Sequence, residues 1–515
     1  MQVRNFNRHV RRFVVCCGTR ILAALLLYGA MAIAASAQTY VILHSFSGPD
    51  GEFPTGPLVQ GVDGKWYGTT EYGGANFGTK CQSNGGSGCG SIFKIGRYGA
   101  LTTFYTFCPQ TGCPDGYAPM GSLAEGPYGS YYGIAMRGGF GSRSGGGTAF
   151  RFTPGAPEVT LYTFCTLANC TDGFQPSSVV EGWDGSLHGT TQFGGFGVGI
   201  TSAGDGTVYR LTPGGKLTTT YTFCRHLTCP DGSQPQDLIQ GTDGNLYGVT
   251  LAGGIINNAV PPASSGAGTL FRIGSTGFTT LSLFCTQTAC SDGASPLHLI
   301  QAADGDLYGV TEYGGHTDSN NTFGNGTVFK VTTAGTLTTL YTFCTQTGCP
   351  DGGDPVMLMQ GSDLNFYGTT AGGGSNHAGT IFRLTPGGTL TTLHNFASYE
   401  GAPTSLMQGT DGAFYGTIYS GGGKGRGSIF RLDMGLGPFV QPVLTFGKVG
   451  ARVTILGTDL TGATAVHFNG TASTFTVGSG TAISTTVPAG ATSGPVTVTT
   501  PSGTLTSKVA FTVLP

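Results

Sequence analysis

Seven acidic residues recur at one position of a repeated pattern and are the first candidates for chemistry. Five precede a glycine beside a cysteine pair, and two stand at the matching place in outer copies. A carboxylate ring of this kind would suit a cation or a sugar. Asp-Gly followed by proline is also ordinary turn chemistry, which is the favoured interpretation. The seven residues are Asp50, Asp115, Asp172, Asp231, Asp292, Asp351 and Glu400.

The remaining acids and histidines fit repeated structural positions better than catalytic ones. Asp63 and its five equivalents lie in Asp-Gly segments that predict tight hairpins. His44 and His394 stand where other copies have tyrosine, and His188 also replaces a repeat tyrosine. No H-E-x-x-H pattern occurs, so the histidines predict no zinc or nucleophile site.

A third set of residues is a candidate ligand surface. Aromatic side chains flank a Gly-Gly step in four copies, where we expect them to be exposed and to stack on sugar rings or to pack locally. Arg137 and Glu312, at neighbouring positions, differ from copy to copy. The aromatic residues are Tyr72, Phe193, Tyr313 and Tyr419.

Motifs of common enzymes and cofactor sites are missing from the sequence. There is no G-x-S-x-G, Walker A or dinucleotide fingerprint, so we assign no catalytic residue and expect no cofactor and no metal. Acids from separate repeats can still form a catalytic site without a local motif. The formal net charge of -2 provides no basic surface for nucleic acid.

The cysteines indicate an oxidising compartment. Cys16 and Cys17 lie near the N-terminus, and ten of the other twelve form C-x4-C pairs. Each outer repeat lacks both members of its pair, so we expect local disulfides. Metal is disfavoured because loops of separate repeats would lie too far apart for one zinc ion. The expected pairs are Cys108 with Cys113, Cys165 with Cys170, Cys224 with Cys229, Cys285 with Cys290, Cys344 with Cys349, and Cys81 with Cys89.

One unit occurs seven times between residues 38 and 433. Its phenylalanine recurs every 53 to 61 residues, and each copy contains four short β-type runs separated by turn residues. This predicts an all-β fold with a seven-bladed β-propeller of four-stranded blades. A linear β-solenoid is the alternative. The phenylalanines are Phe46, Phe107, Phe164, Phe223, Phe284, Phe343 and Phe396.

The two ends of the array predict closure and two different faces. Residues 40–46 match the fourth strand of a repeat, while the seventh repeat stops after its third strand at Asp433. We therefore expect the first strand to complete the last blade. Alternate connections of an antiparallel meander share a face, so the Gly-Gly and disulfide loops should lie opposite the short hairpins. Binding residues tend to lie on such variable loops.

Segments outside the array have other roles. Five arginines, an apolar run from Ile21 to Ala34 and Ala35-Ser36-Ala37 predict a signal peptide over 1–37, with an uncleaved anchor or twin-arginine export as alternatives. After a linker at 434–439, residues 440–515 alternate as in an immunoglobulin-like β-sandwich. No later run is long and apolar enough to span a membrane once the signal is cleaved.

Two family resemblances rest on these motifs. "VTILGTDL", "VHFNG" and "VPAGATSGPVTV" make the C-terminal segment resemble the IPT/TIG family of immunoglobulin-like domains, which implies a spacer or interaction module. "LMQGSDLNFYGTT" and "GTIFRLTPGG" make the repeats resemble the GloVer-type tandem repeat of bacterial choice-of-anchor proteins. That resemblance implies a bacterial surface or extracellular protein and brings no established activity.

These observations favour one functional hypothesis and leave others open. We expect a secreted or cell-surface, noncatalytic binding or scaffold protein that recognises a glycan or a protein through its disulfide-loop face. The alternative is an extracellular polysaccharide-active enzyme, a glycosidase or lyase. A structural envelope component that self-associates is a third possibility.

Overall fold

The structure is a computed structural model that describes residues 38–76, 81, 88–126, 129–139, 145–195, 204–226, 228–255, 266–317 and 323–515. The described chain is all-β, as predicted, apart from two 3-10 turns, η2 (Ala168–Cys170) and η3 (Thr288–Cys290). The predicted signal peptide at 1–37 lies outside the described residues. In the ranges given above, no helix is long and apolar enough to cross a membrane.

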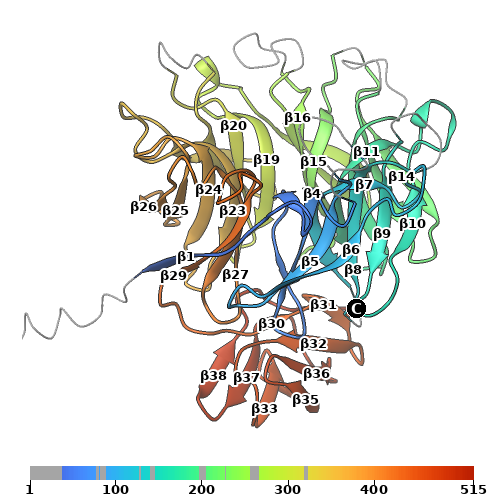
Figure 1. The fold of residues 1–515 in the computed structure, drawn as a ribbon, viewed down its shortest axis with the longest axis vertical. Coiled ribbons are helices and arrows are strands. Elements are labelled where there is room, and N and C mark those ends of the chain that lie inside the picture. Colours follow the sequence, from blue (N-terminus) through green and yellow to red (C-terminus); the bar gives the residue numbers. More distant parts are fainter. Residues whose placement is uncertain are drawn as a thin grey trace, which may run out of the picture.

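Residues 39–433 form seven antiparallel sheets, six with four strands and one with five (Figure 1). The first sheet contains β2 (Glu52–Pro54), β3 (Val59–Gln60), β4 (Trp66–Tyr72), β5 (Ser91–Ile95) and β6 (Leu101–Thr106). The second contains β7 (Tyr117–Glu125), β8 (Tyr131–Arg137), β9 (Thr148–Phe152) and β10 (Val159–Thr163), and the third β11 (Phe174–Glu181), β12 (Leu187–Phe193), β13 (Thr207–Leu211) and β14 (Leu217–Thr222).

The later sheets repeat this order. The fourth contains β15 (Ser233–Gln240), β16 (Leu246–Ala252), β17 (Thr269–Gly274) and β18 (Gly277–Leu283), and the fifth β19 (Ala294–Gln301), β20 (Leu307–Tyr313), β21 (Thr327–Val331) and β22 (Leu337–Thr342). The sixth contains β23 (Gly353–Gln360), β24 (Phe366–Gly372), β25 (Thr380–Leu384) and β26 (Leu390–Asn395), and the seventh β27 (Pro403–Gln408), β28 (Phe414–Ile418), β29 (Ser428–Asp433) and β1 (Thr39–Ser45).

The glycine of the Tyr-Gly motif is required by the packing of the phenylalanine in the Phe-Arg motif. Gly368 of β24 pairs with Phe382 of β25, and a Cβ at Gly368 would collide with the end of the Phe382 ring. The same collision would occur between Gly309 and the ring of Phe329. Glycine is therefore required at this position because a completely buried aromatic ring lies across it.

Neighbouring sheets pack in a closed series. In each sheet the second strand contacts the first strand of the next sheet, from β4 on β7 through β24 on β27, and β2 contacts β28. Strand β1 pairs antiparallel with β29, from Thr39 opposite Asp433 to Ser45 opposite Ser428. The predicted pairing of the first strand with the last repeat is confirmed, so the seventh sheet joins two distant parts of the chain.

Residues 441–514 form two further four-stranded sheets and one parallel pair. One sheet is ordered β30 (Gln441–Pro442), β32 (Arg452–Leu456), β36 (Ala482–Thr486), β35 (Phe475–Ser479), and the other β34 (Thr471–Ser473), β33 (Ala465–Phe468), β37 (Val496–Thr500), β38 (Gly503–Thr506). Strands β31 (Phe446–Lys448) and β39 (Thr512–Leu514) form the parallel pair. Both sheets contribute to one buried core that includes Ile455, Ile483, Val466 and Val498, which makes this segment a sandwich.

The sandwich contacts one end of the ring of sheets. Thr481 donates a hydrogen bond to the carbonyl oxygen of Val62 over 2.8 Å, and the hydroxyl oxygens of Thr458 and Thr410 lie 3.1 Å apart. Val62 and Thr410 lie in the short hairpins of the first and seventh sheets. Figure 1 shows the sandwich at the lower end of the ring of sheets. We call this end the hairpin face, and the opposite end, which holds the disulfide loops, the loop face.

Candidate functional site

The loop face is built from two kinds of connection that are bonded together. The six predicted cysteine pairs are all joined as disulfides, including Cys344 with Cys349 and Cys81 with Cys89. In five sheets the second glycine of the Gly-Gly step donates its N–H to the carbonyl oxygen of the second cysteine. Gly374, for example, donates to Cys349 over 2.8 Å. The predicted common face of the Gly-Gly and disulfide loops is thereby confirmed.

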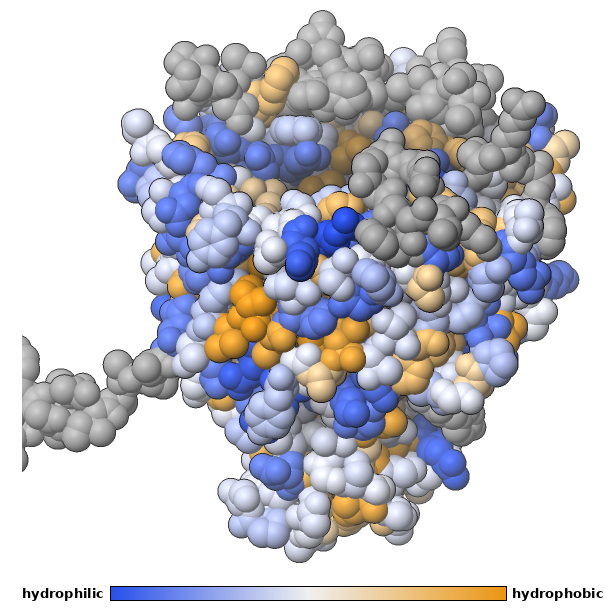
Figure 2. All heavy atoms as spheres, in the orientation of Figure 1, coloured by the Kyte–Doolittle hydropathy of each residue, from blue (hydrophilic) through white to orange (hydrophobic). Residues whose placement is uncertain are grey.

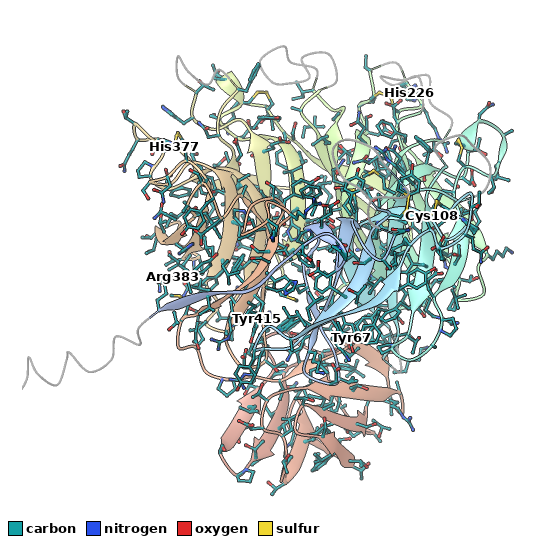
Figure 3. The ribbon with its side chains drawn as sticks, viewed as in Figure 1. Tyr67, Cys108, His226, His377, Arg383 and Tyr415 are labelled. Carbon is teal, nitrogen blue, oxygen red and sulfur yellow. A yellow bond between two sulfur atoms is a disulfide. The ribbon has the colours of Figure 1, made fainter. Side chains whose placement is uncertain are left out.

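The seven acids of the loop face have structural roles. Asp351 accepts hydrogen bonds from the Tyr341 hydroxyl at 2.8 Å and from the backbone N–H of Cys344 at 3.1 Å. His44 takes the place of the tyrosine in the seventh sheet, where its Nε2 lies 2.8 Å from Asp50 Oδ2. These contacts bear out the turn interpretation for the ring of acids. Figure 3 places Cys108, His226 and His377 toward this face, and Tyr67 and Tyr415 nearer the sandwich.

The four aromatic candidates lie at the ends of the second strands but differ in exposure. The expectation that all are exposed is wrong for Tyr72, which is 3% exposed and packs edge-on against Phe53. Tyr419 is half-buried because its ring stacks on Phe53, with centroids 4.9 Å apart, and its hydroxyl donates to Glu71 over 2.9 Å. Phe193 is half-buried opposite Phe174, with ring centroids 6.3 Å apart.

Glu312 and Tyr313, at the end of β20, lie near a second acid. Burial raises the pKa of Glu312, and the nearby carboxylate of Asp354 raises it further. Burial also raises the pKa of Asp354, and burial together with Glu312 raises that of Tyr313 to about 12. Asp354 is the second residue of β23 and adopts a positive φ of 54°. The last candidate, Arg137, is half-buried at the end of β8 and pairs across the strands with Tyr117.

A cavity of about 260 Å³ lies along the axis between the first strands, and the sequence did not single out its residues. At its wall, Gln192 of β12 donates a hydrogen bond over 3.3 Å to Gln236 of the neighbouring β15. His298 Nε2 lies 3.8 Å from Asp237 Oδ2, and burial raises the pKa of Asp237. The cavity is lined by Thr55, Pro57, Met120, Gly121, Met136, Pro176, Ser177, Gln192, Gln236, Leu297, His298, Val356, Met357 and Thr404.

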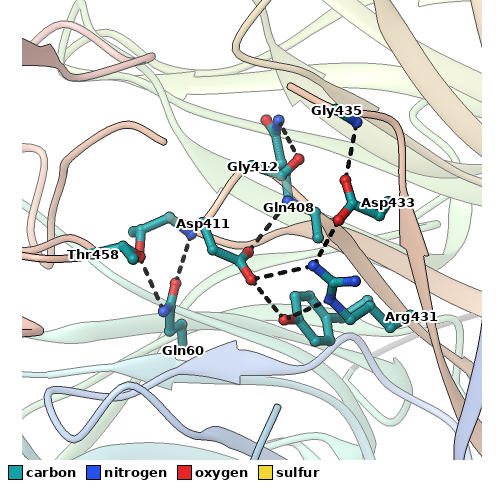
Figure 4. Close-up of polar contacts among 11 residues, drawn as sticks. Gln60, Gln408, Asp411, Gly412, Arg431, Asp433, Gly435 and Thr458 are labelled. Atoms are coloured by element: carbon teal, nitrogen blue, oxygen red, sulfur yellow. Dashed lines mark hydrogen bonds and ion pairs between the residues drawn. The ribbon is translucent and has the colours of Figure 1, made fainter. Parts of the chain in front are cut away.

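The hairpin face contains a ring of glutamines that join neighbouring sheets. In five sheets the strand that precedes the first hairpin ends in glutamine. The amide oxygen of this glutamine accepts a hydrogen bond from a backbone N–H in the hairpin of the preceding sheet. Figure 4 shows this network around Gln60 and Gln408, with Asp411 and Arg431 beside it. The bonds run from Thr410 to Gln60 (2.9 Å), Trp183 to Gln240 (3.3 Å), Thr242 to Gln301, Ala303 to Gln360 and Ser362 to Gln408 (each 2.8 Å).

One argument made from the sequence about metal ligands is wrong. Sulfur atoms from two connections do converge, since those of Cys81, Cys89, Cys108 and Cys113 lie within 4.8 Å of one another. Separate loops can therefore come close enough for a shared site. The four sulfurs are bonded as two disulfides, and a disulfide has no thiolate to bind zinc.

Comparisons with known proteins identify the repeat. The model of the Gloeobacter/Verrucomicrobia repeat matches residues 140–319 and 259–487, which together span more than half of the chain. No curated protein matches the sequence.

Similar solved structures include an extracellular domain of the putative hybrid two component system BT3049 from B. thetaiotaomicron. It is 11% identical with a TM-score of 0.47, and the match covers 90% of this chain and 52% of that one, so the chain spans about half of its length. A fungal alcohol oxidase of the AA5 family in complex with copper is 13% identical (TM-score 0.45; 90% and 98% covered). The WD40 β-propeller domain of Doa1 is 11% identical (TM-score 0.43; 76% and 96% covered).

Proposed function

We propose that the chain, which belongs to the Gloeobacter/Verrucomicrobia repeat family, is a secreted or cell-surface protein whose loop face binds a glycan or a protein without catalysis. In this proposal residues 38–433 are a seven-bladed β-propeller, 434–439 a linker and 440–515 an immunoglobulin-like domain of the IPT/TIG kind, following a signal peptide at 1–37. The sandwich acts as a spacer on the hairpin face.

Sheet packing and cysteine chemistry support the architecture and the compartment. Seven sheets in a cyclic contact series, closed by β1 on β29, fit a propeller better than a solenoid, whose terminal repeats do not meet. Six disulfides fit an oxidising compartment outside the cytoplasm, in agreement with the leader-like residues at the N-terminus.

The strongest support for binding at the loop face is its combination of a fixed backbone with varied side chains. Its backbone is held rigidly by repeated disulfides and turn acids, while the side chains at the ends of the second strands change from sheet to sheet. Phe193, Glu312, Tyr313 and Tyr419 are all half-buried, so each presents part of its surface at that rim. Aromatic faces next to carboxyl groups suit the stacking and hydrogen bonding that sugars require. A fixed scaffold with varied side chains is the usual basis of selective binding.

The test is binding of the secreted chain to a glycan array and to surface-protein extracts, with purified ligands then titrated against variants. Phe193→Ala and Tyr313→Ala should each weaken binding about tenfold or more. Tyr98→Ala is the matched control, because Tyr98 is 86% exposed in a hairpin of the first sheet, on the opposite face. Equal losses in all three variants, or no ligand in either screen, would count against the proposal.

A second candidate, an extracellular polysaccharide-active enzyme, rests on Glu312 and Asp354. Two interacting carboxyl groups with raised pKa values on one face are the kind of pair that glycosidases use. Incubation with a panel of polysaccharides should then release reducing ends, and Glu312→Gln and Asp354→Asn should each abolish the release. Binding that persists in both variants without product favours the noncatalytic proposal.

A further inference from the structure

The glutamine ring of the hairpin face is interrupted in two neighbouring sheets, where glutamic acid replaces glutamine. Glu125 ends β7 and Glu181 ends β11, in the same pairing position as Gln240 at the end of β15. A glutamine in this ring both accepts and donates, whereas an ionised carboxyl group only accepts. In the glutamine ring, the residue that donates its backbone N–H lies two positions after the glutamine of the preceding sheet, as Thr242 follows Gln240. For Glu181 the residue at that sequence position is Pro127, and proline has no backbone N–H.

Both acids are left with an unsatisfied oxygen. Glu125 Oε1 and Glu181 Oε2 are buried and have no hydrogen-bond partner among the described residues. Burial raises the pKa of Glu125 to about 8 and that of Glu181 to about 7, and no charged group in the described ranges opposes either shift. An unpaired buried polar group costs free energy, so two unpartnered carboxyl oxygens side by side are unexpected in a native protein and indicate a function.

The two side chains line one cavity of about 280 Å³ between the hairpin face and the sandwich. Trp183 and Phe446 form its aromatic part, with ring centroids 6.3 Å apart, and Val443 and Leu444 contribute apolar surface. No lysine, arginine or histidine is among the lining residues that the structure describes. Lys508 lines an adjoining cavity, where its ammonium group stands over the Phe439 ring at 5.4 Å.

We infer that this cavity is a binding site for a small organic cation, a primary ammonium or guanidinium group on a short alkyl chain, held by Glu125 and Glu181. The carboxylates supply charge-assisted hydrogen bonds. Trp183 offers the aromatic face that attracts cations most strongly. Apolar residues around it suit an alkyl chain, and the volume exceeds what one metal ion needs while approaching that of a small-ligand site. The site lies on the face opposite the proposed glycan or protein surface.

Isothermal titration calorimetry of the whole secreted chain tests this site with butylguanidinium and butylammonium, and with n-butanol as the neutral analogue. Both cations should bind one per chain and butanol should not. Because the free acids hold protons near neutral pH, binding at pH 6.5 should release protons, measured as different heats in two buffers of unlike ionisation enthalpy. This readout uses the unaltered chain and needs no variant.

Variants then assign the site. Glu125→Gln with Glu181→Gln should weaken binding about tenfold or more and remove the proton release. Glu158→Gln is the matched control, since burial also raises the pKa of Glu158 to about 7, but it lies near Asp115 on the loop face. Trp183→Leu provides a second route if the double variant does not fold, and should also weaken binding.

The source of the cation is separated by comparing the free ions with blocked tripeptides that carry a central lysine or arginine. Binding of the free ions alone indicates a small metabolite, and equal binding of the peptides indicates a protein side chain. Three results would overturn the inference: no heat with either cation, equal binding of butanol, or unchanged affinity in both the double variant and Trp183→Leu. Displacement of the cations by Ca²⁺ at equal concentration would also overturn it, in favour of a metal site.

Discussion

A tyrosine and an aspartate ten residues apart form a recurring hydrogen bond at the loop face. Tyr105 donates to Asp115 and Tyr221 to Asp231, each over 2.8 Å. In the seventh sheet, whose loop has no cysteines, the partners are His44 and Asp50, six residues apart. The shorter loop therefore keeps the contact by exchanging the donor. These two sequence positions were each recognised as repeated, yet their pairing was not predicted, because it depends on how an irregular loop returns to the strand.

Replacing Asp351 by alanine tests this contact at residue level. The change leaves the Tyr341 hydroxyl and the Cys344 N–H without their acceptor, so we expect the free energy of unfolding to fall by about 2 kcal/mol. Denaturant titration followed by circular dichroism measures the change. Tyr341→Phe removes only one of the two bonds and should cost less. An Asp351→Ala midpoint equal to that of the unaltered chain would contradict the structural role.

The buried acids of the hairpin face make a pH-dependent contribution to stability. In the folded state the pKa values of Glu125 and Glu181 are raised to about 8 and about 7, against an ordinary value of 4.5. Between pH 4.5 and 8 the unfolded chain loses these protons while the folded chain retains them, so stability falls as the pH rises.

Urea unfolding at pH 5 and pH 8 should reveal this loss. We expect the unaltered chain to lose at least about 2 kcal/mol more than the Glu125→Gln, Glu181→Gln double variant over that interval, because the folded-state pKa of each acid lies above its unfolded one. Parallel pH profiles for the two proteins would show that neither acid is held in its neutral form.

At the scale of elements, five of the connections between neighbouring sheets contain a local crosslink. A C-x4-C disulfide closes a very small loop, and the bonded cysteine then accepts the N–H of the Gly-Gly step, as Cys290 does from Gly315 over 2.9 Å. The crosslink therefore orders two connections at once. Sequence reasoning predicted the five C-x4-C pairs because their partners appear and disappear together within one chain, and it paired Cys81 with Cys89 because they share one loop.

Removal of one crosslink by Cys344→Ser with Cys349→Ser should lower the free energy of unfolding by about 2 kcal/mol, from the chain-entropy gain of the unfolded state. Thermal unfolding with and without a reducing agent measures it. The difference between variant and unaltered chain should disappear once all disulfides are reduced. A variant as stable as the unaltered oxidised chain would mean that the bond contributes nothing.

For the whole molecule, the repeat pattern predicted the arrangement of the strands and loops, whereas the surroundings of single side chains were predicted less well. The strand order, the β1–β29 pairing and the common loop face all follow from counting repeats and connections. The exposure of Tyr72 was mispredicted because Phe53 covers it from another strand. The sequence did not predict that Glu125 and Glu181 line a shared cavity, because that cavity forms only where the sandwich packs against the hairpins. Comparison of the copies would have shown that these two positions depart from glutamine.

The loop face, the hairpin face and the two proposed binding sites all depend on a closed ring of sheets. Deletion of residues 38–45 tests that closure most directly. Without β1 the seventh sheet exposes the edge of β29, and the last core cluster loses the side chains of Tyr40 and Ile42 that pack against it. We predict that the melting temperature of the deletion variant falls by at least about 5 °C and that the variant associates through the open edge. A monomeric variant that melts at the same temperature as the unaltered chain would contradict a closed ring.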